Sequence, residues 1–463
     1  MSQKPSSSSE PRTLVSHPEL HSHQTVPAFK TLGEAPKSGL ERLLSVFADV
    51  RAGEGAAALL MTANIFLLLA TYYLLKPARE ALILTEGTAV TKVQSSAVQA
   101  VLLLGIVPLF GWLASRVNRI RLITTTSLFS AANLLVFYAL GQAQVREGVA
   151  FFVWVGIFNV FIVSQFWAFA NDFYTEGQGR RLFPMIGVGA SLGAWIGSTS
   201  VPPLIERFAF TPYTLQLLAA VLLVVALGIT YLVNHQARER NEPEAARIEA
   251  APLGKEGGFQ LILQDRYLML IAVLVILLNV VNTTGEFLLG SLVRTSSLSL
   301  ADASARSAYI GTFYGSYYGL VNLVGFLLQL FVTSRAMRFL GVRGALFILP
   351  TLAFINYSII AVVPILAIVR IGKILENGTD YSIQNTIRQT LFLPTSREVK
   401  YKAKAAIDTL GQRLGDVAAA GVATLGTFLG MALGGFAWVN VGLTVVWLFV
   451  AGQIAREHRR KTV

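Results

Sequence analysis

A long succession of apolar runs constrains the fold of this chain more than any other feature. Twelve runs of roughly 20 residues succeed one another, and roughly 20 residues is the length at which a helix crosses about 30 Å of hydrocarbon. They lie at 56–83, 89–114, 121–142, 149–171, 184–206, 212–234, 267–292, 307–334, 342–361, 363–387, 404–432 and 435–453. Because backbone groups in lipid must be satisfied within the protein, each run is predicted to be a helix. The sequence therefore predicts an all-α integral membrane protein with 12 transmembrane helices in the lipid bilayer.

Composition supports this interpretation and excludes several kinds of site. Of the 463 residues, 54% are hydrophobic and only 14% are charged, which is typical of a chain buried mostly in lipid. Cysteine is absent, so disulfides and thiolate sites are excluded. The five histidines fall outside the predicted helices, at His17, His21, His23, His235 and His458. There is no Walker A motif and no nucleophilic constellation. We therefore expect no metal, no cofactor and no enzyme activity.

Polar segments divide the chain into regions. Residues 1–39 are predicted to be a disordered polar N-terminal tail, and 40–54 an amphipathic helix at the membrane interface. Residues 55–234 and 267–453 are each predicted to be a six-helix bundle. The most polar internal stretch, 235–266, is predicted to be a cytoplasmic linker between them, and 454–463 a basic C-terminal tail.

The distribution of basic residues predicts the orientation in the membrane. Most of the 38 Lys and Arg residues lie in both end segments and in every second loop, and cytoplasmic segments carry such an excess. Both termini are therefore predicted to face the cytoplasm. The net charge of +12 follows from this asymmetry. Because the basic residues are spread over membrane loops without interleaved aromatic residues, we expect no nucleic-acid partner.

A two-fold repeat relates the two predicted bundles. The basic loop GWLASRVNRIRL, residues 111–122, has a counterpart in TSRAMRFLGVRG, residues 333–344. Glycines spaced four apart let helices approach closely in lipid, and they occur in the predicted fifth and eleventh helices. These ladders are Gly189, Gly193 and Gly197, and Gly426, Gly430 and Gly434. Two matched six-helix halves resemble the major facilitator architecture, in which the binding site lies near the midplane between the halves.

Charged side chains concentrate in four of the predicted helices. An ionisable group at the centre of a membrane helix costs about 2.5–3.5 kcal/mol, so a retained one usually faces a cavity or a partner. The charged residues are Lys76, Arg79 and Glu80 in the first helix, Asp172 in the fourth, Glu286 in the seventh, and Arg370, Lys373, Glu376 and Asp380 in the tenth. The first and fourth helices of each half thus carry them, and these helices line the central cavity in the architecture that this chain resembles.

The spacing of these charges predicts their roles. Two cation pairs at i, i+3, one from each half, suit a phosphorylated anion, and we expect Lys76, Arg79, Arg370 and Lys373 to bind its oxygens. The acidic residues are expected to orient these bases, form gate ion pairs or carry coupling protons; they are Glu80, Asp172, Glu286, Glu376 and Asp380. Alternatively, pairs such as Lys76 with Glu80 only neutralise each other within the bundle, and Asp172 reaches water.

Three segments resemble a known family of transporters. They are YYLLKPAREALIL (72–84), FWAFANDFYTEGQGRRLFPMIGVGAS (166–191) and LFLPTSREVKYKAKAAIDTLGQRLGD (391–416). Each is similar to the corresponding segment of the ATP:ADP antiporters of obligate intracellular bacteria and plastids. In the first segment, Arg79 and Glu80 occupy the family's basic–acidic pair.

The resemblance implies a transporter that moves ATP, ADP or a related phosphorylated anion by alternating access. It further implies a monomer in the inner membrane of a bacterium. Two other functions stay open from the residues. One is proton-coupled transport of a smaller organic anion or zwitterion, and the other is a non-transporting membrane scaffold or sensor on the same fold.

Overall fold

The computed structural model describes residues 37–45, 49–114, 116–239, 258–396, 399 and 403–462. Every regular element within these residues is helical. Nine of the described helices are long and apolar enough to cross a membrane. The all-α membrane fold is thus confirmed, although some predicted spans appear as interrupted helices. Residues 1–36 of the predicted N-terminal tail lie outside the described residues.

The first half follows the predicted spans closely. Its helices are α1 (Gly39–Leu44), α2 (Gly55–Glu86), α3 (Ala89–Ala114), α4 (Arg119–Gln142), α5 (Gly148–Phe173), α6 (Glu176–Phe208) and α7 (Pro212–Glu239). Side-chain caps explain where several of them begin. Thr175 and Gln178 form a capping box at the start of α6, and Asn118 accepts from the Ile120 amide at the start of α4. Helix α2 continues without a break through Pro77.

In the second half, π-helical turns interrupt three of the predicted spans. The elements are α8 (Gly258–Gln264), α9 (Arg266–Ser297), α10 (Ala303–Leu327), η2 (Leu328–Thr333), α11 (Ser334–Ala345), α12 (Ile348–Val362), α13 (Leu366–Thr379), η3 (Asp380–Gln384), α14 (Asn385–Leu391), α15 (Lys404–Ala406), η5 (Ile407–Gly411), α16 (Gln412–Phe428) and α17 (Leu433–Thr462). The expected break near Pro364 separates α12 from α13. The basic segment 454–463 continues α17 as far as Thr462 rather than following it as a separate tail.

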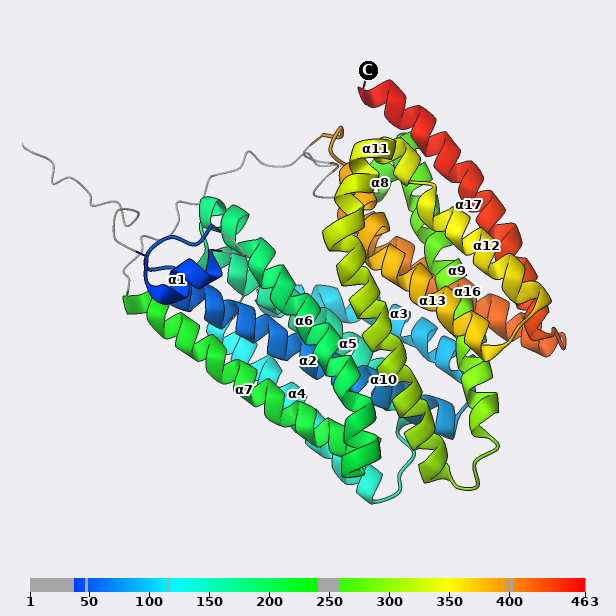
Figure 1. The fold of residues 1–463 in the computed structure, drawn as a ribbon, viewed down its shortest axis with the longest axis horizontal. Coiled ribbons are helices and arrows are strands. Elements are labelled where there is room, and N and C mark those ends of the chain that lie inside the picture. The colour runs from blue at the N-terminus through cyan, green and yellow to red at the C-terminus, as the bar shows by residue number, and fades with distance from the viewer. Residues whose placement is uncertain are drawn as a thin grey trace, which may run out of the picture.

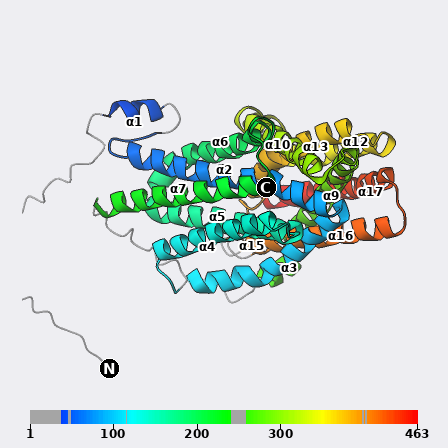
Figure 2. The ribbon, with the colours of Figure 1, turned by 90° about the horizontal axis from the view of Figure 1, so that it is seen from below.

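The two halves are bundles that lie side by side (Figures 1 and 2). Figure 2 shows α10 beside α6 at one edge of the interface and α3 beside α16 at the other, and these pairs are in contact. We call the end with α1, α8 and the C-terminus the terminal end. The opposite end, with Gly87 and residues 298–302, is the closed end. Toward the terminal end the halves diverge (Figure 1).

Contacts between α6 and α10 join the halves toward the closed end. A Cβ on Gly315 would lie 2.8 Å from Pro202, so these two helices touch almost backbone to backbone. Further along, the Asn322 side-chain amide donates to the Ala194 carbonyl and the Ser198 hydroxyl at 3.2 and 3.1 Å. Helices α6 and α10 are therefore packed closely across the interface between the halves.

The first glycine ladder packs α6 against α2 as predicted. A Cβ on Gly189, Gly193 or Gly197 would lie 2.3–2.6 Å from the nearest atom of Thr62, Phe66 or Ala70, respectively. This contact needs glycine because any larger side chain would push the helices apart.

The second predicted ladder is wrong. Helix α16 ends at Phe428, Gly430 has a φ of +71° in the following turn, and Gly434 belongs to α17. Two other glycines make the equivalent contact of the second half, where α16 and the preceding η5 pack on α9. A Cβ on Gly415 would lie 2.4 Å from Asn279, and one on Gly411 would lie 3.1 Å from Val275.

Candidate functional site

A polar cavity of about 860 Å³ lies between the two halves. Its walls come from α2, α3 and α5 of the first half and from α9, α10, α13, η3 and α16 of the second. The side chains that matter most below are Tyr72, Lys76, Arg79, Glu80, Lys92, Glu286, Tyr318, Asn377 and Tyr381. Because both halves supply the walls, any movement between the halves changes the shape of this cavity.

Lys76 presents a cation to the cavity without a carboxylate partner in the described part of the chain. Its Nζ lies 3.9 Å from the centre of the Tyr318 ring and 5.3 Å from that of Tyr73. Only 8% of the residue is exposed. Aromatic faces attract a cation without neutralising it. The Lys76 amine is therefore held in place at the cavity wall without a carboxylate of the described residues bound to it.

Arg79 and Lys92 share the buried carboxylate of Glu80. Arg79 Nη2 lies 2.7 Å from Glu80 Oε1, and Lys92 Nζ lies 2.8 Å from Glu80 Oε2. The Tyr318 hydroxyl also donates to Glu80 Oε1 at 3.2 Å. The Arg79 guanidinium packs over the Phe152 ring at 4.3 Å. Glu80 thus holds two cations, one from α2 and one from α3.

Glu286 connects this cluster to the second half. Its Oε2 lies 3.6 Å from Lys92 Nζ, so an ion pair crosses between α3 and α9. Its Oε1 accepts from the Tyr317 hydroxyl at 2.9 Å and from the Asn377 side-chain amide at 3.0 Å. Glu286 is thus held by groups from both halves.

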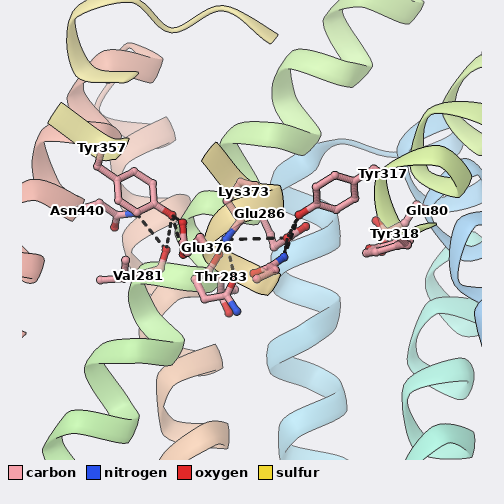
Figure 3. Close-up of polar contacts among 12 residues, drawn as sticks. Glu80, Val281, Thr283, Glu286, Tyr317, Tyr318, Tyr357, Lys373, Glu376 and Asn440 are labelled. Carbon is pink, nitrogen blue, oxygen red and sulfur yellow. Dashed lines mark hydrogen bonds and ion pairs between the residues drawn. The ribbon is translucent and has the colours of Figure 1, made fainter. Parts of the chain in front are cut away.

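Lys373 is neutralised within the second half (Figure 3). Its Nζ donates to Asn282 Oδ1 at 2.6 Å and to Glu376 Oε1 at 3.1 Å, and it lies 4.0 Å from Glu286 Oε1. The Tyr357 hydroxyl completes the cluster by donating to Glu376 Oε2 at 2.9 Å. None of the Lys373 side chain is exposed.

Five of the predicted residues do not line the cavity: Lys373 and Glu376, described above, and Arg370, Asp172 and Asp380. Arg370 donates to the Ser316 hydroxyl at 2.9 Å and packs over Phe313. Asp172 forms an ion pair with Arg119, and 42% of its side chain is exposed, as the alternative of solvent contact anticipated. Asp380 begins η3 and is not among the cavity-lining residues, whereas the adjacent Tyr381 is.

Sequence reasoning missed Lys92 and the tyrosines of α10. Lys92 lies in the first turn of α3, where a basic residue is easily assigned to the preceding loop. Tyr317 and Tyr318 lie three and four residues after Tyr314, so each shares a face of α10 with it. That spacing was the available signal. All three rings pack together, with centroids 5.1–5.9 Å apart.

The cavity combines charged groups of both signs with aromatic rings. Groups of three or more His, Asp or Glu able to hold a metal are absent from the residues that the structure describes. The cavity is lined by three basic side chains, three carboxylates and several aromatic rings; the carboxylates are Glu80, Glu286 and Asp416. Such groups bind charge and flat apolar surfaces without a reactive nucleophile.

Comparison with known proteins places these features in a family context. The family model described as TLC ATP/ADP transporter matches residues 150–457. The chain is 24% identical over 346 residues to ADP,ATP carrier protein 4 of Rickettsia bellii, an alignment that covers 65% of each chain. It is 23% identical to ADP,ATP carrier protein 1 of Chlamydia muridarum, covering 65% of this chain and 64% of that one. The chain thus matches just under two thirds of the length of these relatives.

Solved structures with the same fold are transporters. A variant of the nucleoside transporter NupG aligns with a TM-score of 0.66 at 12% identity, covering 86% of this chain and 99% of that one. A bacterial homologue of the iron transporter ferroportin, in an inward-facing state, aligns with a TM-score of 0.62 at 12% identity, covering 86% and 98%. At such identities the likeness concerns the fold alone, which is of the major facilitator type.

Proposed function

Since this chain belongs to the TLC ATP/ADP transporter family, we propose that it exchanges nucleotides such as ATP and ADP, or a closely related phosphorylated anion, across a membrane. The central cavity between the halves is the proposed binding site. The protein acts as a monomer in the inner membrane of a bacterium, with both termini in the cytoplasm. The terminal end then faces the cytoplasm.

The Lys76 amine, which lines the cavity without a carboxylate bound to it in the described part of the chain, is the observation that supports this proposal most strongly. A buried cation without a carboxylate partner is costly, and a bound anion removes that cost. Arg79 lies one turn away on the same helix, and its guanidinium can share Glu80 with Lys92 or turn to a phosphate oxygen. Lys76 and Arg79 are the proposed phosphate ligands.

Aromatic rings on the same walls suit the base of a nucleotide. Tyr72, Phe152, Tyr318 and Tyr381 all line the cavity. Flat rings offer stacking surfaces to a purine, and the cations stand beside them. The same cavity therefore offers rings for the base and cations for the phosphates of a nucleotide.

Alternating access follows from the way in which the halves are joined. The ion pair between Lys92 and Glu286 crosses the interface, and so do the contacts of α6 with α10. Rocking the halves about the cavity breaks these contacts at the closed end and forms others at the terminal end. In this scheme Glu80 and Glu286 are gate carboxylates, because each holds cations that a substrate competes for.

Counterflow in proteoliposomes tests the proposal. Vesicles containing the purified protein are loaded with unlabelled ADP, ATP or buffer, and entry of labelled ADP is followed. Exchange predicts entry only with internal nucleotide, and Lys76→Gln and Arg79→Gln should abolish it while the protein stays folded. Entry driven instead by a pH gradient, without internal nucleotide, would favour proton-coupled transport. No flux of any anion from folded protein would favour the scaffold or sensor.

A further inference from the structure

A second polar cavity lies at the closed end, away from the central one. It has a volume of about 700 Å³ and is formed by the start of α3, the ends of α9 and α16, and the start of α17. Its polar lining consists of the Arg294 side chain and the hydroxyl-bearing residues Thr88, Ser291, Thr295 and Thr427. All of its lining residues are described by the structure, and none is acidic. The cavity is therefore cationic.

Arg294 makes only part of its possible contacts here. Its Nε donates to the Gly87 carbonyl at 2.7 Å. Gly87 is the C-cap of α2, so this hydrogen bond joins the second half to the first. Within the described ranges, the two terminal nitrogens of the guanidinium have no hydrogen-bond or ion-pair partner. Arg294 and the hydroxyl-bearing residues together line the cavity.

We propose that this cavity is a second anion site, which binds the phosphate oxygens of the substrate at the closed end. A guanidinium presents two parallel donors to a phosphate, and hydroxyls from α9, α16 and the turn before α3 can complete the contacts. Because Arg294 also holds Gly87, a phosphate that draws the guanidinium away loosens a bond between the halves. Binding at this face would thereby favour opening of the closed end.

A purely structural role for Arg294 is the competing explanation. A basic side chain in the last turn of a helix is favourable by itself, and Arg294 stands at the end of both α9 and α2. That role needs neither a cavity nor a ring of hydroxyls. Only the anion site predicts that an added phosphate compound slows the reaction of a thiol introduced on the cavity wall.

Site-directed labelling tests binding without requiring transport. Because the chain contains no cysteine, Thr427→Cys introduces a single thiol on the cavity wall. Its alkylation by a membrane-impermeant maleimide is timed in reconstituted protein, with and without inorganic pyrophosphate and at matched ionic strength in chloride. Pyrophosphate should slow labelling several-fold, and Arg294→Gln should remove this protection. Equal rates with and without pyrophosphate would overturn the site.

Arg306→Gln is the matched control. Arg306 is an arginine at the same end, but it donates to the Leu300 carbonyl of its own half and does not line the cavity. Protection by pyrophosphate should persist in this variant. Protection lost equally in both variants would show a general effect of surface charge and would also count against the site.

Transport measurements then test whether this cavity takes part in substrate recognition. That role rests on the proposed function. Arg294→Gln should raise the KM for nucleotide supplied at the closed end on the order of tenfold. The KM at the terminal end should change little. Equal changes at both faces would assign Arg294 a structural role only. Pyrophosphate protection of the thiol does not require nucleotide exchange. Failure of the anion site, seen as no protection, is therefore distinguishable from failure of the proposed function, seen as no exchange in the counterflow assay.

Discussion

Lys92 of α3 lies 3.6 Å from the Glu286 carboxylate of α9, and this ion pair joins the two halves at the wall of the central cavity. The same ammonium lies 2.8 Å from Glu80. Both carboxylates are largely withdrawn from solvent, with side-chain exposures of 0% for Glu80 and 19% for Glu286. Lys92 therefore balances two acidic groups, one from each half.

Replacing Lys92 by Gln should lower both stability and exchange. Leaving a buried charge without its partner typically costs about 3–5 kcal/mol, and the link between the halves is lost as well. The unfolding temperature in detergent and the counterflow rate report these two effects. Lys461→Gln is the control, because Lys461 pairs with Asp265 at a site where about a third of each side chain is exposed, 34% for both. Equal behaviour of the two variants would contradict the role given to Lys92.

The ring and the hydroxyl of Tyr318 have separable functions. The ring holds the Lys76 ammonium at 3.9 Å, whereas the hydroxyl donates to Glu80 at 3.2 Å. Tyr318→Phe keeps the ring and should change the KM for nucleotide only a few-fold. Tyr318→Leu removes it and should raise that KM on the order of tenfold, as loss of a desolvated cation–π contact would. A Phe variant as impaired as the Leu variant would show that the hydroxyl matters more.

Gly193 is predicted to tolerate no side chain. A Cβ there would lie 2.3 Å from the Phe66 carbonyl oxygen, and backbone cannot yield as a side chain can. Gly193→Ala should therefore destabilise the first half by about 1–3 kcal/mol, seen as a lower unfolding temperature. Gly187→Ala in the same helix has open space around it and should be neutral or slightly stabilising. If the Gly193 variant unfolds no earlier than the Gly187 variant, α2 and α6 do not pack as closely as described.

Glu147, between α4 and α5, makes stability depend on pH. Burial raises the pKa of Glu147 to about 7; the nearby Glu86 adds to the rise, and the hydrogen bond from Gln216 opposes it. Because the folded protein holds this proton more tightly than the unfolded chain does, stability falls as pH rises from about 4.5 to about 7. Comparing unfolding temperatures at about pH 5 and about pH 8 should show this loss.

The matched variant for that experiment is Glu147→Gln. Its side-chain oxygen can still accept from Gln216, which donates to Glu147 at 2.7 Å in the native protein. The variant should keep the stability of the acidic form and lose the part of the pH dependence that Glu147 causes. A pH profile identical to that of the native protein would assign the dependence to other groups.

The positions of the spanning helices could be predicted from the sequence because hydrocarbon thickness sets their length. The run 89–114 and α3 have the same bounds, and the break near Pro364 is where α12 gives way to α13. The glycine contact of α6 with α2 was equally accessible, since close approach needs small residues at every fourth position. The π-helical turns were not, because no residue pattern marks where a helix widens.

Which charges meet was decided by the tertiary structure alone. Lys76 and Lys373 both belong to cation pairs at i, i+3, yet Lys76 faces the cavity over an aromatic ring and Lys373 is bound by Asn282 and Glu376. Spacing along a helix shows which residues share a face, but the rotation of that helix against its neighbours determines what the face meets. Lys92 reaches two acids only because α3 packs beside α2 and α9. The sequence thus determined the helices and predicted a class of ligand, and packing between the halves decided which cations line the cavity.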